Sequence, residues 1–168
     1  MGILNLTPDS FHDGGVWNGT AQAVERAGQM LSEGADILDL GAQSTRPGAQ
    51  HVGASEEWSR LGPVLDALKK GHPEAIVSVD TFHAEVAQRA LDHGADIIND
   101  VSGGDADLLM GDVVAKARPP YVMMHLQGVP ASMQNPPSYD DVVEDVLRVL
   151  QTKLFRAYDA GLLGVIWD

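Results

Sequence analysis

The stretch at residues 34–39, Gly-Ala-Asp-Ile-Leu-Asp, recurs almost unchanged at residues 94–99 as Gly-Ala-Asp-Ile-Ile-Asn. In both copies an amphipathic stretch stops at a glycine, and a run of aliphatic residues begins three positions later. Glycine adopts the left-handed conformation that ends many helices, and short aliphatic runs are typical of buried strands. The repeat therefore predicts a helix–turn–strand unit that occurs more than once in the chain.

Short apolar runs of strand length occur along the whole chain. We expect strands at residues 3–6, 36–40, 75–79, 95–99, 121–124 and 163–167. Between them apolar residues recur at helical spacing, and we expect helices at residues 20–33, 55–70, 84–93, 105–117 and 142–154. Strands that alternate with helices form parallel sheets joined by crossover helices. The pattern thus predicts an α/β fold with six parallel strands and five helices.

The helix expected at residues 55–70 has the clearest end signals. Ser55 is placed to cap its N-terminus, and Glu57 lies in its first turn, where a negative charge interacts favourably with the helix dipole. Gly71 is placed to end the helix in a left-handed cap. Because Pro63 lies inside the pattern, we expect a kink there or a later start of the helix.

The number of strands leaves two architectures open. A closed barrel of eight β/α units takes roughly 250 residues, and this chain has 168. Six strands fit either an open doubly wound sheet or a barrel without its last strands. The last residue, Asp168, follows directly on an expected strand, and we therefore expect a truncated chain.

The composition excludes several classes of partner and site. Lys and Arg number 11 against 24 Asp and Glu, which gives a net charge of −13. A chain this acidic repels nucleic acid and anionic membranes, and no basic run offsets the mean charge. Cysteine is absent, which rules out disulfides, thiolate catalysis and cysteine-ligated zinc. No apolar stretch approaches the roughly 18 residues of a membrane span, and no signal peptide is visible. We expect a cytoplasmic protein, with an organelle also compatible.

Polar residues stand at the ends of the expected strands. Asn5, Asp80, Asn99 and Asp168 lie inside or directly after apolar runs. In parallel α/β folds the chemistry gathers where the strands end, so these side chains would form one ring of hydrogen-bond donors and acceptors. Such a ring suits a flat, nitrogen-rich heterocycle. The alternative is that each side chain bonds to a neighbouring loop.

Two glycine-rich loops follow the first two expected strands, at residues 8–19 and 42–54. Loops of this length at strand ends are typical of mobile lids. Arg46 in the second loop could hold an anion through its guanidinium group, or it could be a solvated loop residue. His125 could act as an acid or base, although a structural role is favoured. Neither a dinucleotide-binding fingerprint nor a phosphate-binding P-loop is found.

Several of these segments resemble the signatures of the dihydropteroate synthase family of pterin-binding enzymes, in family order. They are residues 1–11 (MGILNLTPDSF), 13–15 (DGG), 39–48 (DLGAQSTRPG), 78–81 (SVDT), 97–101 (IINDV) and 123–128 (MMHLQG). The resemblance implies a (β/α)8 TIM barrel, here an incomplete one. It also implies a single pterin-binding domain over residues 1–168 that lacks the C-terminal third, and a homodimeric parent protein.

The resemblance further implies a transferase of folate biosynthesis, the target of sulfonamides. It would join 6-hydroxymethyl-7,8-dihydropterin diphosphate to p-aminobenzoate, giving 7,8-dihydropteroate and pyrophosphate, with Mg2+ bound at the diphosphate. Asp80, Asn99 and Asp168 would bind the edge of the pterin ring, with Met124 packed beside it. Asn5 would contact the diphosphate and its Mg2+ and would belong to the catalytic set.

The same resemblance gives roles to residues of the two loops. Thr45 would help to hold the diphosphate, and Arg46 would be a catalytic lid residue near the anionic groups. Phe11 and Pro47 would shape the p-aminobenzoate pocket. Asp13 would stabilise positive charge that develops on the pterin methylene group.

Two other functions stay open at this point. The first is the methyltetrahydrofolate-binding barrel of a corrinoid methyltransferase, which shares the polar ring for the pterin edge. The Ser-Thr-Arg-Pro segment at residues 44–47 argues against it, because a methyl carrier has no diphosphate to hold. The second is an inactive fragment whose open sheet edge favours association.

Overall fold

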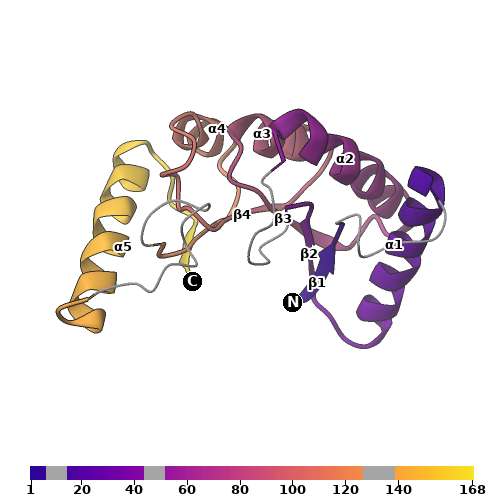
Figure 1. Cartoon of the computed structure of the whole chain (residues 1–168), viewed down its shortest axis with the longest axis horizontal. Coiled ribbons are helices and arrows are strands. Elements are labelled where there is room, and N and C mark those ends of the chain that lie inside the picture. Colours follow the sequence, from indigo (N-terminus) through magenta and orange to yellow (C-terminus); the bar gives the residue numbers. More distant parts are fainter. Residues whose placement is uncertain (7–14, 44–51, 127–138) are drawn as a thin grey trace.

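The computed structural model describes residues 1–6, 15–43, 52–126 and 139–168. In this part of the chain six strands alternate with five helices (Figure 1). The elements are β1 (Gly2–Asn5), α1 (Gly15–Ser32), β2 (Ile37–Gly41), α2 (Ala54–Gly71), β3 (Ile76–Asp80), α3 (Ala84–Asp92), β4 (Ile97–Asp100), α4 (Met110–Ala117), β5 (Tyr121–Met123), α5 (Val142–Asp159) and β6 (Val165–Trp167). The expected element order is confirmed.

The strand order decides between the two architectures. All neighbouring strands are parallel, and they follow one another as β1-β2-β3-β4-β5-β6. A doubly wound sheet reverses its order at a switch point and carries helices on both faces. Here the helices form an arc outside the strands, and both termini lie on the inner side (Figure 1). The fold is an incomplete (β/α) barrel, in which β1 and β6 are unpaired edges among the described residues.

The ends of the helices differ from the predictions in several places. Helix α2 begins at Ala54 after an extended Gly53, so Ser55 is not its N-cap. It continues through the exposed Pro63 without a later start, because the buried leucines on either side of the proline hold it against the sheet. The left-handed cap expected at Gly71 is also absent: Gly71 is the last helical residue, and the C-cap that follows has φ −136°.

Of the other helices, α3 and α5 begin at their predicted first residues, Ala84 and Val142, and two do not. Helix α1 begins earlier than expected, and helix α4 begins later. Helix α5 begins after Asp141, whose carboxylate accepts hydrogen bonds from the backbone N–H groups of Val143 and Glu144. Gly34 and Gly94, in the repeat, both have positive φ values, 100° and 91°, so the two predicted glycine turns are confirmed.

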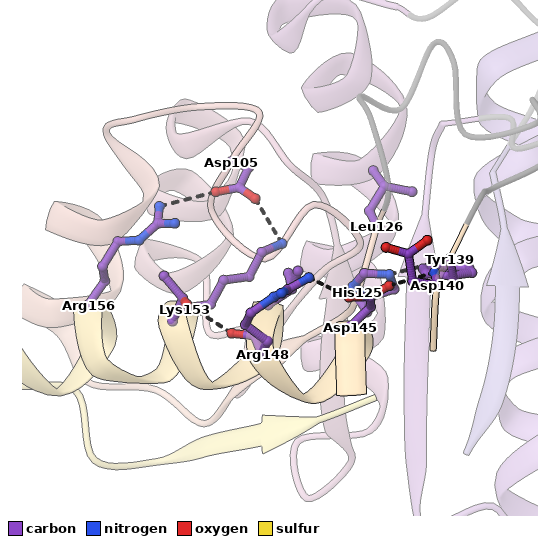
Figure 2. Close-up of a pocket in the computed structure, with 11 residues that line it drawn as sticks. Asp105, His125, Leu126, Tyr139, Asp140, Asp145, Arg148, Lys153 and Arg156 are labelled. Atoms are coloured by element: carbon purple, nitrogen blue, oxygen red, sulfur yellow. Dashed lines mark hydrogen bonds and ion pairs between the residues drawn. The ribbon is translucent and has the colours of Figure 1, made fainter. Parts of the chain in front are cut away.

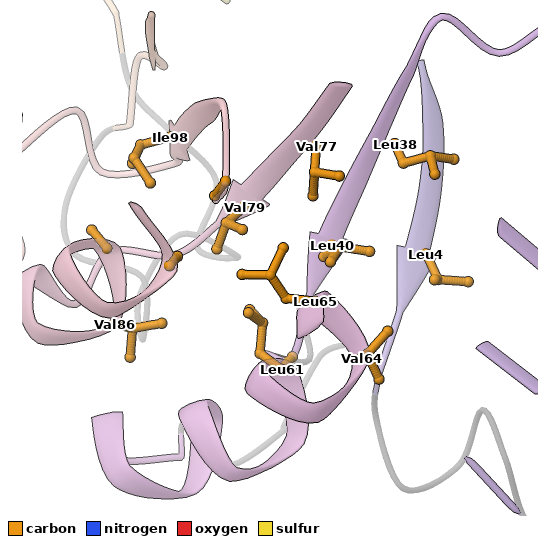
Figure 3. Close-up of a cluster of buried hydrophobic side chains, with 14 of the residues drawn as sticks. Leu4, Leu38, Leu40, Leu61, Val64, Leu65, Val77, Val79, Val86 and Ile98 are labelled. Carbon is orange, nitrogen blue, oxygen red and sulfur yellow. The ribbon is translucent and has the colours of Figure 1, made fainter. Parts of the chain in front are cut away.

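The hydrophobic core lies between the sheet and the arc of helices (Figure 3). Alternate strand residues such as Leu40, Val79 and Ile98 point toward the helices and are fully buried. Leu61 and Leu65 of α2 pack against them. Because successive strand residues point to opposite faces, the residues between these apolar ones project to the inner side of the arc. That inner face carries the polar side chains.

Candidate active site

Three predicted residues stand in one row at the ends of β1, β3 and β4. Asn5 pairs in register with Gly41, Gly41 with Asp80, and Asp80 with Asn99. Neighbours in register on parallel strands project to the same face. A Cβ atom on Gly41 would lie 3.4 Å from Oδ2 of Asp80 and 3.8 Å from Oδ1 of Asn5. The side chains of Asn5 and Asp80 therefore flank a position that has no side chain of its own.

Asp39 supports this row, and the sequence analysis missed it as a site residue. It lies on β2 two residues before Gly41, so it projects to the same face. Its side chain is buried, and Oδ2 accepts a hydrogen bond of 3.2 Å from Nδ2 of Asn99. Oδ1 of Asp39 and Oγ of Ser78 are buried without a hydrogen-bond partner among the described residues. These two buried polar atoms can therefore form hydrogen bonds with a ligand or with water.

The electrostatics of the site centre on Asp80. Burial raises the pKa of Asp80 to about 7, and the charges of Asp39, Glu57 and Asp100 add to the effect. The carboxyl group therefore ionises much less readily than an exposed aspartate does. A ligand that presents N–H donors to Asp80 stabilises the ionised form.

Asp100, the neighbour of Asn99, projects away from the row because strand residues alternate. Its carboxylate is fully buried and accepts four hydrogen bonds, two of which come from Ser102. The other two come from the backbone N–H of Gly104 and the hydroxyl of Tyr121. Burial and the Asp100 charge raise the pKa of Tyr121 far above its usual value. Asp100 fixes the turn after β4, and through that turn the end of the strand that carries Asn99.

Asp168 and Met124 lie at the same edge of the sheet. The backbone N–H of Asp168 donates to the carbonyl of Met123 at 3.2 Å, and that of Met124 donates to the carbonyl of Asp100 at 3.4 Å. No hydrogen bond or ion pair between described residues joins Asp168 to Asp80 or Asn99. In register, Asn99 pairs with Val122 and Val122 with Ile166, so Asp168 lies two residues beyond the row at the same end of the sheet.

His125 lines a cavity whose lining includes none of the residues of the row. The cavity has a volume of about 700 Å³ and lies beside α5 (Figure 2). His125 Nε2 lies 3.0 Å from the hydroxyl of Tyr139, which supports a structural role. The cations of this cavity are paired: Lys153 and Arg156 both contact Asp105.

The comparisons with known proteins agree with the predicted motifs. The family model of pterin binding enzymes matches residues 1–168. The chain belongs to the pterin binding enzyme family. It is 52% identical to a mitochondrial folate synthesis bifunctional protein of Arabidopsis thaliana, over 98% of this chain and 30% of that protein. It is 41% identical to the dihydropteroate synthase of Synechocystis, over 97% of this chain and 56% of that protein.

Solved structures give the same family assignment. A dihydropteroate synthase of Xanthomonas albilineans, solved with 4-aminobenzoic acid, superposes with a TM-score of 0.90 at 42% identity. The match covers all of this chain and 59% of that one. A clostridial dihydropteroate synthase solved in the presence of pteroic acid superposes with a TM-score of 0.92 at 37% identity, over 62% of its length. The predicted resemblance is confirmed, and the chain spans less than two thirds of each of these relatives.

The other residues with predicted roles at the site of this pterin binding enzyme lie in segments that the structure does not describe. Phe11, Asp13, Thr45, Arg46 and Pro47 lie outside the described residues, and their roles stay predictions. Within the described segments no group of three or more His, Cys, Asp or Glu side chains could hold a metal ion. None of the helices there is long and apolar enough to cross a membrane.

Proposed function

We propose that this chain carries the pterin half of a dihydropteroate synthase. Such an enzyme joins 6-hydroxymethyl-7,8-dihydropterin diphosphate to p-aminobenzoate and releases pyrophosphate. The observation that carries the proposal is the row of Asn5, Gly41, Asp80 and Asn99, in register at the ends of four adjacent strands. The motifs of the chain and its similarity to dihydropteroate synthases support the same reaction.

The row has the hydrogen-bonding chemistry that the edge of a pterin ring requires. Ionised Asp80 offers two acceptor oxygens to the ring N–H and amino groups. Asn99 donates one N–H to Asp39, which leaves its amide oxygen and second N–H for the ligand. Gly41 leaves space for a flat ring to lie over the strand. We further propose that Met124 packs on the ring and that Asp168 accepts from its edge.

The diphosphate group of the substrate would lie toward β1. Asn5 has an exposed side chain at the end of β1, and its amide oxygen is a hard ligand of the kind that Mg2+ accepts. Mg2+ commonly takes one or two protein ligands and completes its shell with phosphate oxygens and water, so a single amide oxygen fits this ion. When bound, the ion would neutralise charge on the leaving diphosphate. Thr45 would hold the same group.

The reaction breaks the bond between the pterin methylene carbon and the diphosphate oxygen. Pyrophosphate leaves with the electron pair, and the aniline nitrogen attacks the carbon and loses a proton. A carboxylate close to the methylene group stabilises the developing positive charge, the role we assign to Asp13. Arg46 would stay with the anionic groups, and Phe11 and Pro47 would pack around p-aminobenzoate.

Isothermal titration of the purified chain tests the proposal. We expect saturable binding of the pterin diphosphate with Mg2+, and then binding of p-aminobenzoate. We also expect pyrophosphate release when both substrates are present. Asp80→Ala should weaken pterin binding at least about tenfold, because it removes a charge-assisted hydrogen-bond pair. Asp36→Ala, an exposed carboxylate at the opposite end of β2, is the matched control and should bind as the wild type does.

Two results would contradict the proposal. One is equal binding by the Asp80→Ala and Asp36→Ala variants. The other is a wild-type chain that binds methyltetrahydrofolate but not the pterin diphosphate, which would indicate a methyl carrier. The homodimer and the cytoplasmic location stay predictions; gel filtration and localisation of a tagged chain would check them.

A further inference from the structure

The turn that joins β3 to α3, residues 81–83, directly follows Asp80. No hydrogen bond or ion pair among the described residues holds the Asp80 side chain itself, so its direction depends on where the backbone of the strand and the turn place it. Within the turn, Oγ1 of Thr81 accepts a hydrogen bond of 3.1 Å from the backbone N–H of His83. The backbone N–H of Thr81 donates to the carbonyl of Asn99 at 2.9 Å. The β3–α3 turn therefore connects the strand end that carries Asp80 to the one that carries Asn99.

Glu57 on α2 contacts the β3–α3 turn through His83. Its Oε2 lies 2.6 Å from Nδ1 of His83. An ionised carboxylate can only accept hydrogen bonds, so His83 carries a hydrogen on Nδ1 and donates it to Glu57. The contact joins the first turn of α2 to the N-cap residue of α3.

The burial of Glu57 makes this contact more than a surface ion pair. Its exposed fraction is 0%, although glutamate is among the residues least often buried unless paired. A buried carboxylate needs partners to offset its lost hydration. Those partners are His83 and Gln43, whose Nε2 donates to the same oxygen at 2.8 Å. The sequence analysis assigned Glu57 to a helix-dipole interaction, which was incomplete because both partners are distant in the chain.

Asp107, in the segment between β4 and α4, holds the end of the same turn. Its Oδ2 accepts from the backbone N–H of Ala84, the first residue of α3, at 2.8 Å. The N-cap residue His83 makes no side-chain hydrogen bond to its own helix, so Asp107 provides the cap from another part of the chain. Its Oδ1 accepts from the backbone N–H of Leu109 at 3.0 Å, which orients the carboxylate. Helix α3 lies between α2 and α4 (Figure 1), so Glu57 and Asp107 hold the turn from opposite sides.

We propose that Glu57 and Asp107 are positioning residues that hold the β3–α3 turn and thereby direct the Asp80 carboxylate toward the pterin ring. The inference rests on the proposed function, because that function assigns the pterin to Asp80. Neither Glu57 nor Asp107 needs to contact the substrate. Their effect on binding should therefore pass through Asp80 and disappear when the Asp80 carboxylate is removed.

Isothermal titration with 6-hydroxymethyl-7,8-dihydropterin diphosphate and Mg2+ measures the effect on binding. The titrations are made at pH 8.5, above the pKa of about 7 of Asp80, so that a charge lost nearby does not change affinity by changing the ionisation of Asp80. We expect Glu57→Ala and Asp107→Ala each to weaken binding about tenfold, the effect of losing the hydrogen bonds that hold the turn.

Three further variants serve as rescue and controls. Glu57→Gln keeps an oxygen that accepts from Nδ1 of His83, so its affinity should stay within about twofold of the wild type. Glu56→Ala and Asp112→Ala are the matched controls, because they remove exposed carboxylates in the first turns of α2 and α4. Both controls should bind as the wild type does. A loss in the controls equal to that in Glu57→Ala and Asp107→Ala would overturn the proposal.

A double-mutant cycle with Asp80→Ala separates positioning from a merely structural role. Two sites that act through one interaction are not additive, whereas independent sites are. In the Asp80→Ala background we expect Glu57→Ala and Asp107→Ala to cost less than about twofold in affinity. An equal loss in both backgrounds, or no loss in either, would overturn the positioning role. Asp107 is only half-buried, so Asp107→Ala keeps the test decisive where Glu57→Ala does not fold.

Hydrogen exchange at the His83 amide provides a readout that does not depend on substrate. We expect the His83 N–H, which donates to Thr81, to be protected in the wild type and to exchange at least about tenfold faster in Glu57→Ala. Unchanged exchange would overturn the hold of Glu57 on the turn, even in a chain that binds the pterin. A wild-type chain that does not bind the pterin would overturn the proposed function and, with it, the role of the turn in binding.

Discussion

Nδ2 of Asn99 on β4 donates to Oδ2 of Asp39 on β2 across 3.2 Å, although β3 lies between these two strands. The bond passes over the inner face of β3, which carries Ser78 and Asp80. It orients the Asn99 amide and places a buried carboxylate near Asp80. The same contact therefore organises the row and contributes to the raised pKa of Asp80.

The stability of the chain should depend on the ionisation of Asp80. Its pKa rises from 3.8 to about 7 on folding, so the folded state disfavours the ionised form. The resulting penalty is absent below pH 3.8, grows as the pH rises and is complete above about pH 7, at no more than about 4 kcal/mol. We expect Asp80→Asn to match the wild-type melting temperature at pH 4 and to exceed it by roughly 5–10 °C at pH 8. Thermal melts of both proteins across this range check the prediction, and an equal difference at both pH values would contradict it.

Pterin affinity should respond to pH in the opposite sense. The ionised Asp80 carboxylate offers two acceptor oxygens to the proposed ligand, and the neutral acid offers one acceptor fewer. We expect the affinity to fall about tenfold for each pH unit below 7 and to level off above it. Titrations between pH 5.5 and 8.5 measure this slope. Asp80→Asn should bind more weakly and show no slope, whereas tighter binding at low pH would mean that the neutral acid is the binding form.

Gly41 should be needed for ligand access more than for folding. An added Cβ would make ordinary contacts of 3.4 Å or more with Asp80 and Asn5, so we expect Gly41→Ala to change the free energy of unfolding by less than about 1 kcal/mol. The methyl group would occupy the space between those two side chains and hinder a flat ring. We expect pterin affinity to fall about tenfold. Urea unfolding and titration of the same sample compare the two effects, and unchanged affinity would show that the ring lies elsewhere.

The sequence allowed the six strands to be located along the chain, because each apolar run is short and bounded by glycine or polar residues. The pattern of apolar runs alone did not decide between a doubly wound sheet and a barrel, since that choice depends on which strands pair; the resemblance of the motifs predicted the barrel. The sequential pairing in the structure settles it. Helix starts were less predictable: a serine at position 55 carries a capping signal, yet the backbone turns into the helix at Gly53.

The site was only partly predictable for a related reason. Asn5, Asp80 and Asn99 were identified because a polar residue at the end of an apolar run is conspicuous. Asp39 was missed because it lies inside the apolar run at residues 36–40. Strands that are buried on both faces are apolar almost throughout, so the sequence does not show which residues face the inner side. Glu57 looked like an ordinary acidic residue of a first helical turn, and its burial depends on contacts with distant parts of the chain.

The turn after β4 should contribute stability without contributing to binding. Tyr121 donates its hydroxyl to the buried Oδ2 of Asp100 at 2.7 Å, and Tyr121→Phe leaves that oxygen with one partner fewer. A hydrogen bond to a charged group contributes about 1.5–3 kcal/mol, so we expect a loss of that size in the free energy of unfolding. Tyr158→Phe, on an exposed side chain of α5, should change it by less than about 0.5 kcal/mol. Because Asp100 projects away from the row, pterin affinity of the folded Tyr121→Phe variant should stay within about twofold. A large loss of affinity at unchanged stability would place Asp100 in the binding site and contradict its structural role.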